Sequence, residues 1–199
     1  MLKLLRLTII TLITAVSVYG CAAPAIVAGG AVAGATAVDR RNTEEIVTDS
    51  NIELKIKEAI YTDESIKRHI HVNVTSYNGA VLLSGEIPTA DMRDKVVRYA
   101  QRVDKVKKIY NETVVAPVSE FKSRRQDTWL TTKVKSILLG TKHINALHFK
   151  VVTENQVVYL MGMVTEEEGN IATNAIRQVD GVKQIVKLFE YVLPAASNK

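Results

Sequence analysis

The pattern of apolar and polar positions occurs twice along this chain. Near residue 49 the chain reads "DSNIELKIKEAI", and near residue 127 it reads "DTWLTTKVKSIL". When the two stretches are superimposed, their apolar positions coincide and have the i, i+4, i+7, i+8 spacing of one helical face. Each stretch is therefore predicted to form an amphipathic helix. The coincident pairs are Ile52 with Leu130, Ile56 with Val134, Ala59 with Ile137, and Ile60 with Leu138.

Polar residues indicate where these two helices begin. Ser50 and Glu53 form the pattern of a capping box, which satisfies backbone donors in the first turn of a helix. Asp127 is placed to cap the second helix in the same way.

A β-hairpin is predicted after each of these helices. "IHVNVTSYNGAVLLSGEI" and "LHFKVVTENQVVYLMGMV" alternate apolar and polar residues around a polar turn. Asn78-Gly79 is a strong signal for a two-residue turn. Gln tolerates positive φ poorly, so the turn at Asn155-Gln156 is expected to be looser or of another type. Gly85 and Gly162 occupy matching positions at the end of the second strand.

A second helix and a last strand complete each repeat. One helix begins at Thr89 and the other at Thr165, where three glutamates follow in the first turn. Gly181 suits a positive-φ exit from the latter helix, and Lys105 stands at the matching position in the first repeat. Each repeat therefore reads α-β-β-α-β. We predict an α+β fold in which each small three-stranded mixed sheet is covered by helices.

The start of the chain has the plan of an export signal. Lys3 and Arg6 precede an apolar stretch of signal-peptide length, and small residues lead to the single cysteine, Cys21. The residues Val18-Tyr19-Gly20 resemble the lipobox of bacterial lipoproteins, which implies that Cys21 becomes the acylated N-terminus. The alternative is one long membrane span from Leu4 to Val38.

Two features favour the lipoprotein interpretation over the membrane span. Pro24 interrupts the apolar stretch, and its second half consists of Ala and Gly, which add little hydrophobic transfer energy. Several acyl chains anchor a protein stably, whereas one chain binds only marginally. Ala22 rather than Asp follows Cys21, which in the usual sorting pattern of lipoproteins implies the outer membrane.

These patterns divide the chain into segments. The Ala/Gly-rich tract after Cys21 is too poor in large side chains to build a core, and two domains of this size are marginal alone, so we expect them to pack together or act as a pair. The predicted segments are a signal peptide at 1–20, a tether at 21–48, a first domain at 49–116, a linker at 117–125, a second domain at 126–194 and a tail at 195–199.

Composition and motifs exclude several classes of function. The chain has 26 basic and 21 acidic residues, a mild surplus that does not indicate a nucleic-acid partner. A single cysteine cannot form an internal disulfide. No catalytic or nucleotide-binding motif appears, so we predict neither an enzyme nor a cofactor. His69 and His71 could share one face of a strand, but no acid or cysteine is obviously placed to complete a metal site, and none is predicted.

Trp129 is the candidate binding residue. It lies one position before the buried Leu130, and a step of about 100° turns it away from the core stripe. Lys133 and Lys135 follow on the helix, and Arg124 and Arg125 lie just upstream. An indole beside basic groups can dock on anionic headgroups. Alternatively, Trp129 seals the contact between the domains or packs on the linker. The basic stretch "KVVRYAQRVDKVKK" is interpreted as a solvated helix face.

With its helix starts, the hairpins ending in "VLLSGEI" and "VYLMGMV", and the paired "VDKV" and "VDGV" segments, the chain resembles a tandem BON-domain protein. Together with the lipobox, it is similar to the dual BON-domain outer-membrane lipoproteins of Gram-negative bacteria, the DolP type. The resemblance implies phospholipid binding and support of envelope integrity without known catalysis. It also favours the lipid-binding interpretation of Trp129.

The expected function is that of a lipid-anchored protein at the outer membrane, facing the periplasm, whose second domain binds anionic phospholipid. The alternative is a tethered adaptor that binds an envelope-assembly, cell-wall or division protein.

Overall fold

The computed structural model describes residues 39–194. These residues belong to one compact unit, Thr36–Lys199. The predicted signal peptide, Cys21 with its acylation, the tether up to residue 38 and the tail at 195–199 lie outside the described residues. Within 39–194, no helix is both long and apolar enough to cross a bilayer.

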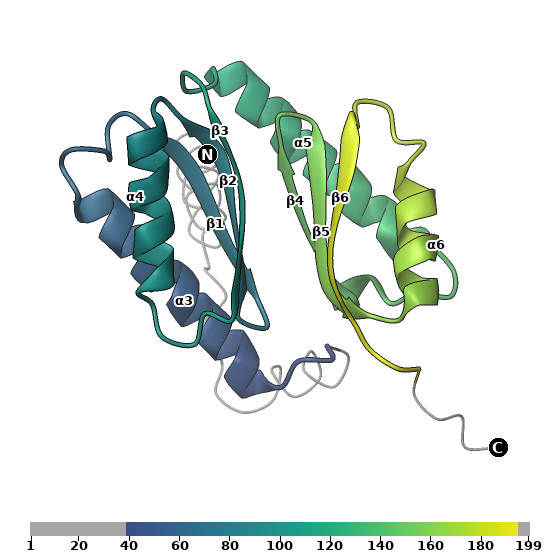
Figure 1. Cartoon of the computed structure of the whole chain (residues 1–199). Helices are drawn as coiled ribbons and strands as arrows, with labels where there is room; N and C mark the ends of the chain where they lie inside the picture. The colour runs from purple at the N-terminus through teal and green to yellow at the C-terminus, as the bar shows by residue number, and fades with distance from the viewer. Residues whose placement is uncertain (1–38, 195–199) are drawn as a thin grey trace, which may run out of the picture. The chain divides into compact units, whose positions relative to one another are not determined.

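The two repeats fold into the same succession of elements (Figure 1). The first repeat comprises α3 (Thr43–Thr62), β1 (His71–Tyr77), β2 (Ala80–Ile87), α4 (Ala90–Gln101) and β3 (Lys108–Val115). The second repeat comprises α5 (Phe121–Gly140), the short 3₁₀ helix η1 (Ala146–His148), β4 (Phe149–Glu154), β5 (Val157–Val164), α6 (Glu166–Ile176) and β6 (Gln184–Tyr191). This order confirms the predicted α-β-β-α-β repeat.

Each repeat forms a mixed sheet of three strands, as predicted, in the order β1-β2-β3 or β4-β5-β6. The hairpin strands are antiparallel, with Val74 opposite Leu83 in the first sheet. The last strand is parallel to the central one, with Leu83 opposite Asn111, because the crossover helix returns the chain to the end of the sheet at which the central strand begins. The second sheet has the same pairing, with Val151, Leu160 and Lys187 in register.

Helices cover one face of each sheet and bury the apolar positions that the periodicity predicts. Ile52, Ile56 and Ile60 of α3 are at most 2% exposed and pack into the first core. Leu130, Val134 and Leu138 of α5 do the same in the second core.

The opposite faces of the two sheets pack against each other. Figure 1 shows the sheets face to face, with the helices outside. This sheet–sheet core consists of Tyr77, Leu82, Tyr159, Met161 and Leu188. Because both of their faces are covered, the central strands β2 and β5 are buried along nearly their whole length.

Hydrogen bonds between the repeats frame this apolar core. Amide groups of one repeat donate to carboxylates of the other, and a tyrosine adds a bond to a main-chain carbonyl. The pairs are Asn73 to Glu154 (2.6 Å), Asn155 to Glu86 (2.6 Å), Asn78 to Glu190 (2.7 Å) and the Tyr77 hydroxyl to the carbonyl of His148 (3.2 Å).

Helix α3 begins at Thr43, inside the segment predicted to be tether. The Asn42 side chain accepts the N–H of Glu45 at 2.8 Å, and the Glu45 carboxylate accepts the N–H of Asn42 at 2.9 Å. This capping box starts the helix, because it satisfies two donors that have no partner within the helix. Residues 43–48 are therefore helical and do not belong to a flexible tether.

The capping box predicted at Ser50 and Glu53 is wrong, because both residues lie inside α3. The Ser50 hydroxyl donates to the carbonyl of Ile46 at 3.0 Å. Glu53 instead accepts the N–H of Ser76, on the adjacent strand, at 2.8 Å.

Helix α5 likewise begins earlier than predicted, at Phe121, so that much of the predicted linker 117–125 is helical. Asp127 is an interior residue of this helix and does not cap it. Its buried carboxylate accepts the backbone N–H groups of Asn155 and Gln156, at 2.9 Å each. Asp127 therefore fastens α5 to the turn of the β4–β5 hairpin.

Both hairpins have the same left-handed turn, contrary to the expectation for Asn155-Gln156. Asn155 and Gln156 have φ of 50° and 66°, close to the 51° and 77° of Asn78 and Gly79. The hydrogen bonds to Asp127 hold Gln156 in this conformation despite its steric cost. In the first repeat Asp49 has the same role and accepts the N–H groups of Asn78 and Gly79 at 2.7 and 2.8 Å.

The matched glycines Gly85 and Gly162 lie where two strands approach closely. A Cβ at residue 85 would lie 2.1 Å from the carbonyl oxygen of His71, and one at residue 162 would lie 2.4 Å from that of His148. Gly181 has φ of 97° and lies in the turn after α6 rather than at the helix end. Lys105 adopts φ of 70° at the matching position.

The role of Asp127 predicts an unequal effect of two substitutions. Asp127→Ala leaves both turn N–H groups without an acceptor and should lower the free energy of unfolding by about 2–3 kcal/mol. Asp127→Asn keeps one acceptor and should cost roughly 1 kcal/mol. Urea unfolding followed by circular dichroism measures both. The exposed Asp180→Ala is the control and should stay within about 0.5 kcal/mol of wild type. Equal stability of all variants would contradict this role.

Candidate functional site

The outward side of α5 is an exposed surface that combines aromatic, aliphatic and basic side chains. We call it the α5 outer face and define it by Phe121, Arg125, Trp129, Lys133 and Leu139. Its three apolar members are largely exposed: Phe121 by 67%, Trp129 by 59% and Leu139 by 70%. Exposed side chains this large are informative when they gather on one face.

The helical repeat places these residues outward. Asp127, Leu130, Val134 and Leu138 point into the second repeat. At about 100° per residue, the outer-face residues lie on the opposite side of the cylinder. The sheet–sheet core contains other residues, so the predicted alternative in which Trp129 seals the contact between domains finds no support among the described residues.

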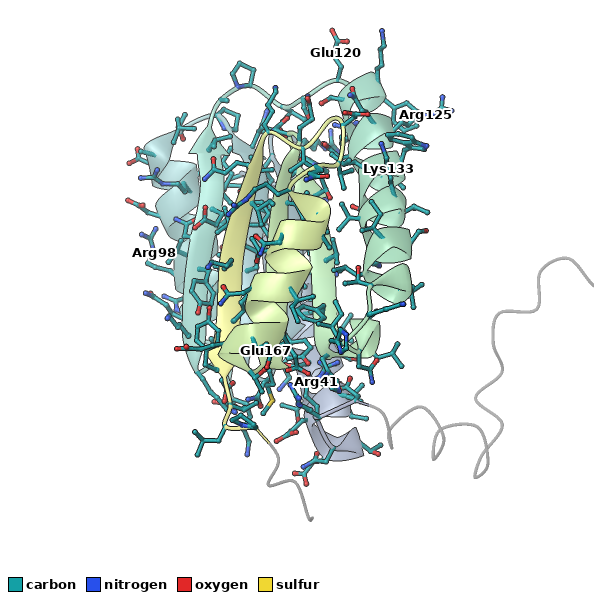
Figure 2. The ribbon with its side chains drawn as sticks, turned by 90° about the vertical axis from the view of Figure 1, so that its right-hand side faces the viewer. Arg41, Arg98, Glu120, Arg125, Lys133 and Glu167 are labelled. Atoms are coloured by element: carbon teal, nitrogen blue, oxygen red, sulfur yellow. The ribbon has the colours of Figure 1, made fainter. Side chains whose placement is uncertain are left out.

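Basic groups of this face lie over its aromatic rings. The Lys133 ammonium is 5.1 Å from the centre of the Trp129 ring, and the Arg125 guanidinium is 5.9 Å from that of Phe121. Figure 2 shows Arg125 and Lys133 together on the upper part of α5. Such cation–π contacts hold a positive charge beside an exposed ring. The face therefore carries two neighbouring pairs of a cation and an aromatic ring, Arg125 with Phe121 and Lys133 with Trp129.

The other two predicted residues lie at the margins of this face, and the Arg124 guanidinium is also 5.9 Å from the centre of the Phe121 ring. Arg124 lies within α5 rather than upstream of it, is half-buried, and donates to the carbonyl of Ser119 at 2.6 Å. Its side chain lines the cleft between the repeats together with His71. Lys135 borders a small apolar depression of about 250 Å³ with Leu139 and Leu147. Of the predicted basic residues, Arg125 and Lys133 thus belong to the α5 outer face, and Arg124 and Lys135 flank it.

Charge distinguishes α5 from α3, its counterpart in the first repeat. Helix α3 has the exposed apolar residues Val47, Leu54 and Tyr61, but it carries five acidic and two basic residues. Helix α5 carries five basic residues and a single acidic one, the buried Asp127. An anionic surface would therefore be attracted to α5 and repelled by α3.

Phe121 and Leu139 belong to this face but are not among the residues that the sequence predicts for it. The signal was present, because Phe121, Arg125, Trp129 and Lys133 follow one another at i, i+4, i+8 and i+12. It became visible only once the helix start was known, since a helix that begins at Asp127 leaves Phe121 in a linker.

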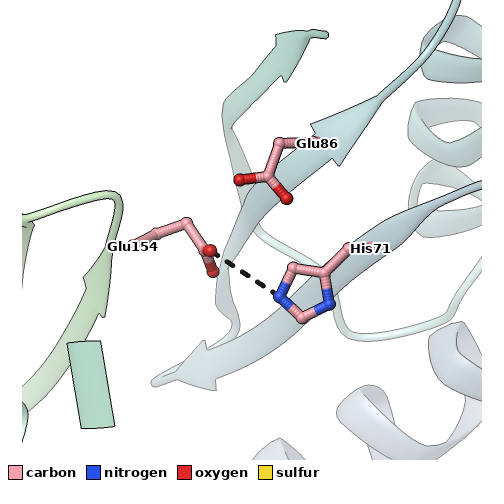
Figure 3. A group of neighbouring side chains, drawn as sticks. All are labelled: His71, Glu86 and Glu154. Carbon is pink, nitrogen blue, oxygen red and sulfur yellow. Dashed lines mark ion pairs between the residues drawn. The ribbon is translucent and has the colours of Figure 1, made fainter. Parts of the chain in front are cut away.

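A second polar cluster lies between the sheets (Figure 3). His71 on β1 faces Glu86 on β2 and Glu154 on β4, and its Nε2 is 3.6 Å from a carboxylate oxygen of Glu154. The hydrogen bond to Glu154 raises the pKa of His71 above its usual value, although burial acts in the opposite direction. The expectation that no acid accompanies His71 is therefore wrong, whereas His69 lies in the preceding turn, outside the cluster.

The repeat, the mixed sheets and the matched glycines define the family, and comparison with known proteins agrees. The BON domain model matches residues 48–117 and 126–192. The chain therefore belongs to the BON-domain family and contains two BON domains.

Two relatives are similar over most of the chain. The outer membrane lipoprotein DolP of Haemophilus influenzae is 39% identical over 173 residues, which cover 87% of this chain and 89% of that protein. The 21 kDa hemolysin of Actinobacillus pleuropneumoniae is 32% identical over 155 residues, 78% of this chain and 80% of that protein.

A solved structure gives a weaker likeness. CdsD, a structural protein of the type III secretion system of Chlamydia trachomatis, is 12% identical with a TM-score of 0.29, over 74% of this chain and 65% of that chain. A TM-score this low supports no conclusion about the fold or function of this chain.

The exposure of Trp129 predicts that its ring contributes little to stability. Trp129→Ala should change the free energy of unfolding by about 0.5 kcal/mol or less, as is usual for surface positions. Leu130→Ala, the adjacent core residue, should cost about 2–5 kcal/mol. Urea unfolding of both variants makes the comparison. A loss for Trp129→Ala as large as that for Leu130→Ala would mean that the indole has a structural role.

Proposed function

We propose that this protein is a non-enzymatic, lipid-anchored protein of the outer membrane whose second BON domain binds anionic phospholipid. The acyl chains at Cys21 anchor it, and the BON domains face the periplasm. The α5 outer face contacts the headgroups. The name of the relative DolP, an outer membrane lipoprotein, supports the location.

One observation carries the lipid-binding part of the proposal: the α5 outer face combines exposed aromatic rings with basic groups and has no exposed acid within the helix. Tryptophan partitions into the interface between water and acyl chains. Each nearby Lys or Arg adds about 1 kcal/mol of attraction to an anionic surface. Phe121 and Leu139 extend the apolar contact to both ends of the helix.

The anchor makes weak headgroup binding sufficient. A domain tethered to a bilayer meets that bilayer at a high effective concentration, because the second contact is intramolecular. Contributions of a few kcal/mol from Arg125, Trp129 and Lys133 then bias the domain toward anionic, accessible regions of the membrane. We propose that this bias is how the protein supports envelope integrity. The adaptor function remains the competing hypothesis, in which the same face grips a protein of the envelope.

A vesicle-binding experiment tests the proposal. The chain from residue 22 to 199, which contains the whole compact unit, is sedimented with vesicles of neutral phosphatidylcholine or with added phosphatidylglycerol. Binding should rise with the fraction of anionic lipid. It should fall between about 0.05 M and about 0.5 M NaCl, because screening shortens the range of attraction. Trp129→Glu should weaken binding by at least about tenfold, a loss of about 1.4 kcal/mol or more.

The matched control is Leu54→Glu. It changes an exposed apolar residue on the equivalent helix of the first domain, where acidic residues already prevail. This variant should bind as wild type does. Equal weakening by Leu54→Glu, or binding to neutral vesicles that is independent of salt, would contradict the proposal. If a photo-crosslinker at position 129 captured one protein and no lipid in cells, the adaptor function would replace it.

A further inference from the structure

Three side chains with metal-binding groups converge between the two sheets. His71, Glu86 and Glu154 each offer one ligand atom, and these atoms all lie within 4.8 Å of one another. Figure 3 shows both carboxylates turned toward the imidazole. His71 and Glu86 come from neighbouring strands of the first BON domain, where they are direct partners in the β1–β2 register. Glu154 comes from the second domain.

Within this cluster two carboxylates face a single imidazole, and the Arg124 guanidinium adds a further positive charge from the same cleft. Glu86 and Glu154 are 3% and 5% exposed. Their hydrogen-bond donors, the side chains of Asn155 and Asn73 and the backbone N–H of Ser119, are neutral. Among the described residues, the only ion pair formed by either carboxylate is the one between Glu154 and His71. Buried carboxylates are costly without compensation, and a divalent cation would neutralise both.

The carboxylates are held in place from outside the cluster. Asn155 donates to Glu86 and Asn73 donates to Glu154, each at 2.6 Å, and each bond crosses between the domains. Metal-binding side chains in proteins are commonly oriented by hydrogen bonds of this kind. His71 and Glu154 also line a cleft of about 410 Å³, which gives an ion access from solvent.

We propose that His71, Glu86 and Glu154 bind one divalent transition-metal ion of the zinc class. One imidazole nitrogen and two carboxylate oxygens match the ligands of Zn²⁺, whereas Ca²⁺ and Mg²⁺ favour ligands that are all oxygen. In a tetrahedral zinc site the ligand atoms lie roughly 3.3–3.5 Å apart, as bonds of about 2.0–2.2 Å require. The His71 and Glu154 atoms, 3.6 Å apart, are already close to this spacing, and the other separations, all within 4.8 Å, have to close by at most about 1.4 Å. Water from the cleft takes the fourth position.

The bound ion would join the two domains. It has ligands from both, so binding favours the state in which the sheets are packed together. Removal of the ion leaves the apolar sheet–sheet core to hold the domains, with His71 as the ion-pair partner of Glu154 and none for Glu86 among the described residues. The ion thus strengthens the contact between the domains without touching the α5 outer face.

Calorimetric titration with ZnCl₂ tests the site. The chain from residue 22 to 199 is freed of metal with EDTA and titrated at about pH 8, because a metal ion binds the deprotonated form of an imidazole. One equivalent of Zn²⁺ should bind. His71→Gln and Glu154→Gln should each weaken binding by more than about tenfold, and Asn73→Ala, which removes the group that orients Glu154, by about 10–100-fold. Co²⁺ should give the visible absorption of a four-coordinate ion, lost in His71→Gln.

His69→Gln is the matched control, because His69 is two residues away and outside the cluster. It should bind Zn²⁺ as wild type does. Circular dichroism and the urea midpoint in EDTA establish that each variant is folded, and Glu86→Gln, close in shape to wild type, provides a further ligand test. Absence of binding at about 100 μM Zn²⁺ would overturn the proposal. So would binding lost in His69→Gln but kept in His71→Gln, or a preference for Ca²⁺ over Zn²⁺.

Discussion

The packing of the two sheets against each other decides which surfaces of this protein face solvent. Leu82, Tyr159 and Met161 close the inner faces of the sheets. The central strands are then buried on both sides, and the outer surfaces belong to the helices and the edge strands. A three-stranded sheet with helices on one face would otherwise leave an apolar face in water, which small domains cannot afford. A partner therefore meets the outward sides of the helices or the edge strands.

The two domains keep the same interior and differ outside. In both, a buried aspartate of the first helix, Asp49 or Asp127, accepts the backbone donors of the hairpin turn and fastens the helix to it. This requirement allows little variation at the inward positions. The outward positions are not bound by it: α5 carries mostly basic residues, whereas α3 carries mostly acidic ones. The difference between the domains thus lies where function can change without loss of the fold.

The sequence predicts most of this fold because the buried positions repeat with helix and strand periods. It misplaces both helix starts, because Asp127 and Ser50 look like caps although neither caps a helix. The sequence predicts a looser turn at Gln156, but a hydrogen bond to Asp127, on another element, holds this residue in the left-handed conformation. At the candidate site, Trp129, Arg125 and Lys133 follow from local spacing. The cluster around Glu154 does not, since Asn73 and Glu154 are 81 residues apart and meet only through the sheet–sheet contact.

The central claim is that the α5 outer face is the surface that meets the bilayer. NMR spectra of the chain from residue 22 to 199 with anionic vesicles that contain a spin-labelled lipid test it most directly, because paramagnetic broadening falls steeply with distance from the label. The account predicts that the signals of the Trp129 indole and of its neighbours on α5 are broadened, while those of Leu54 on α3 are unchanged. Broadening centred on α3, or spread evenly over both domains, would contradict it.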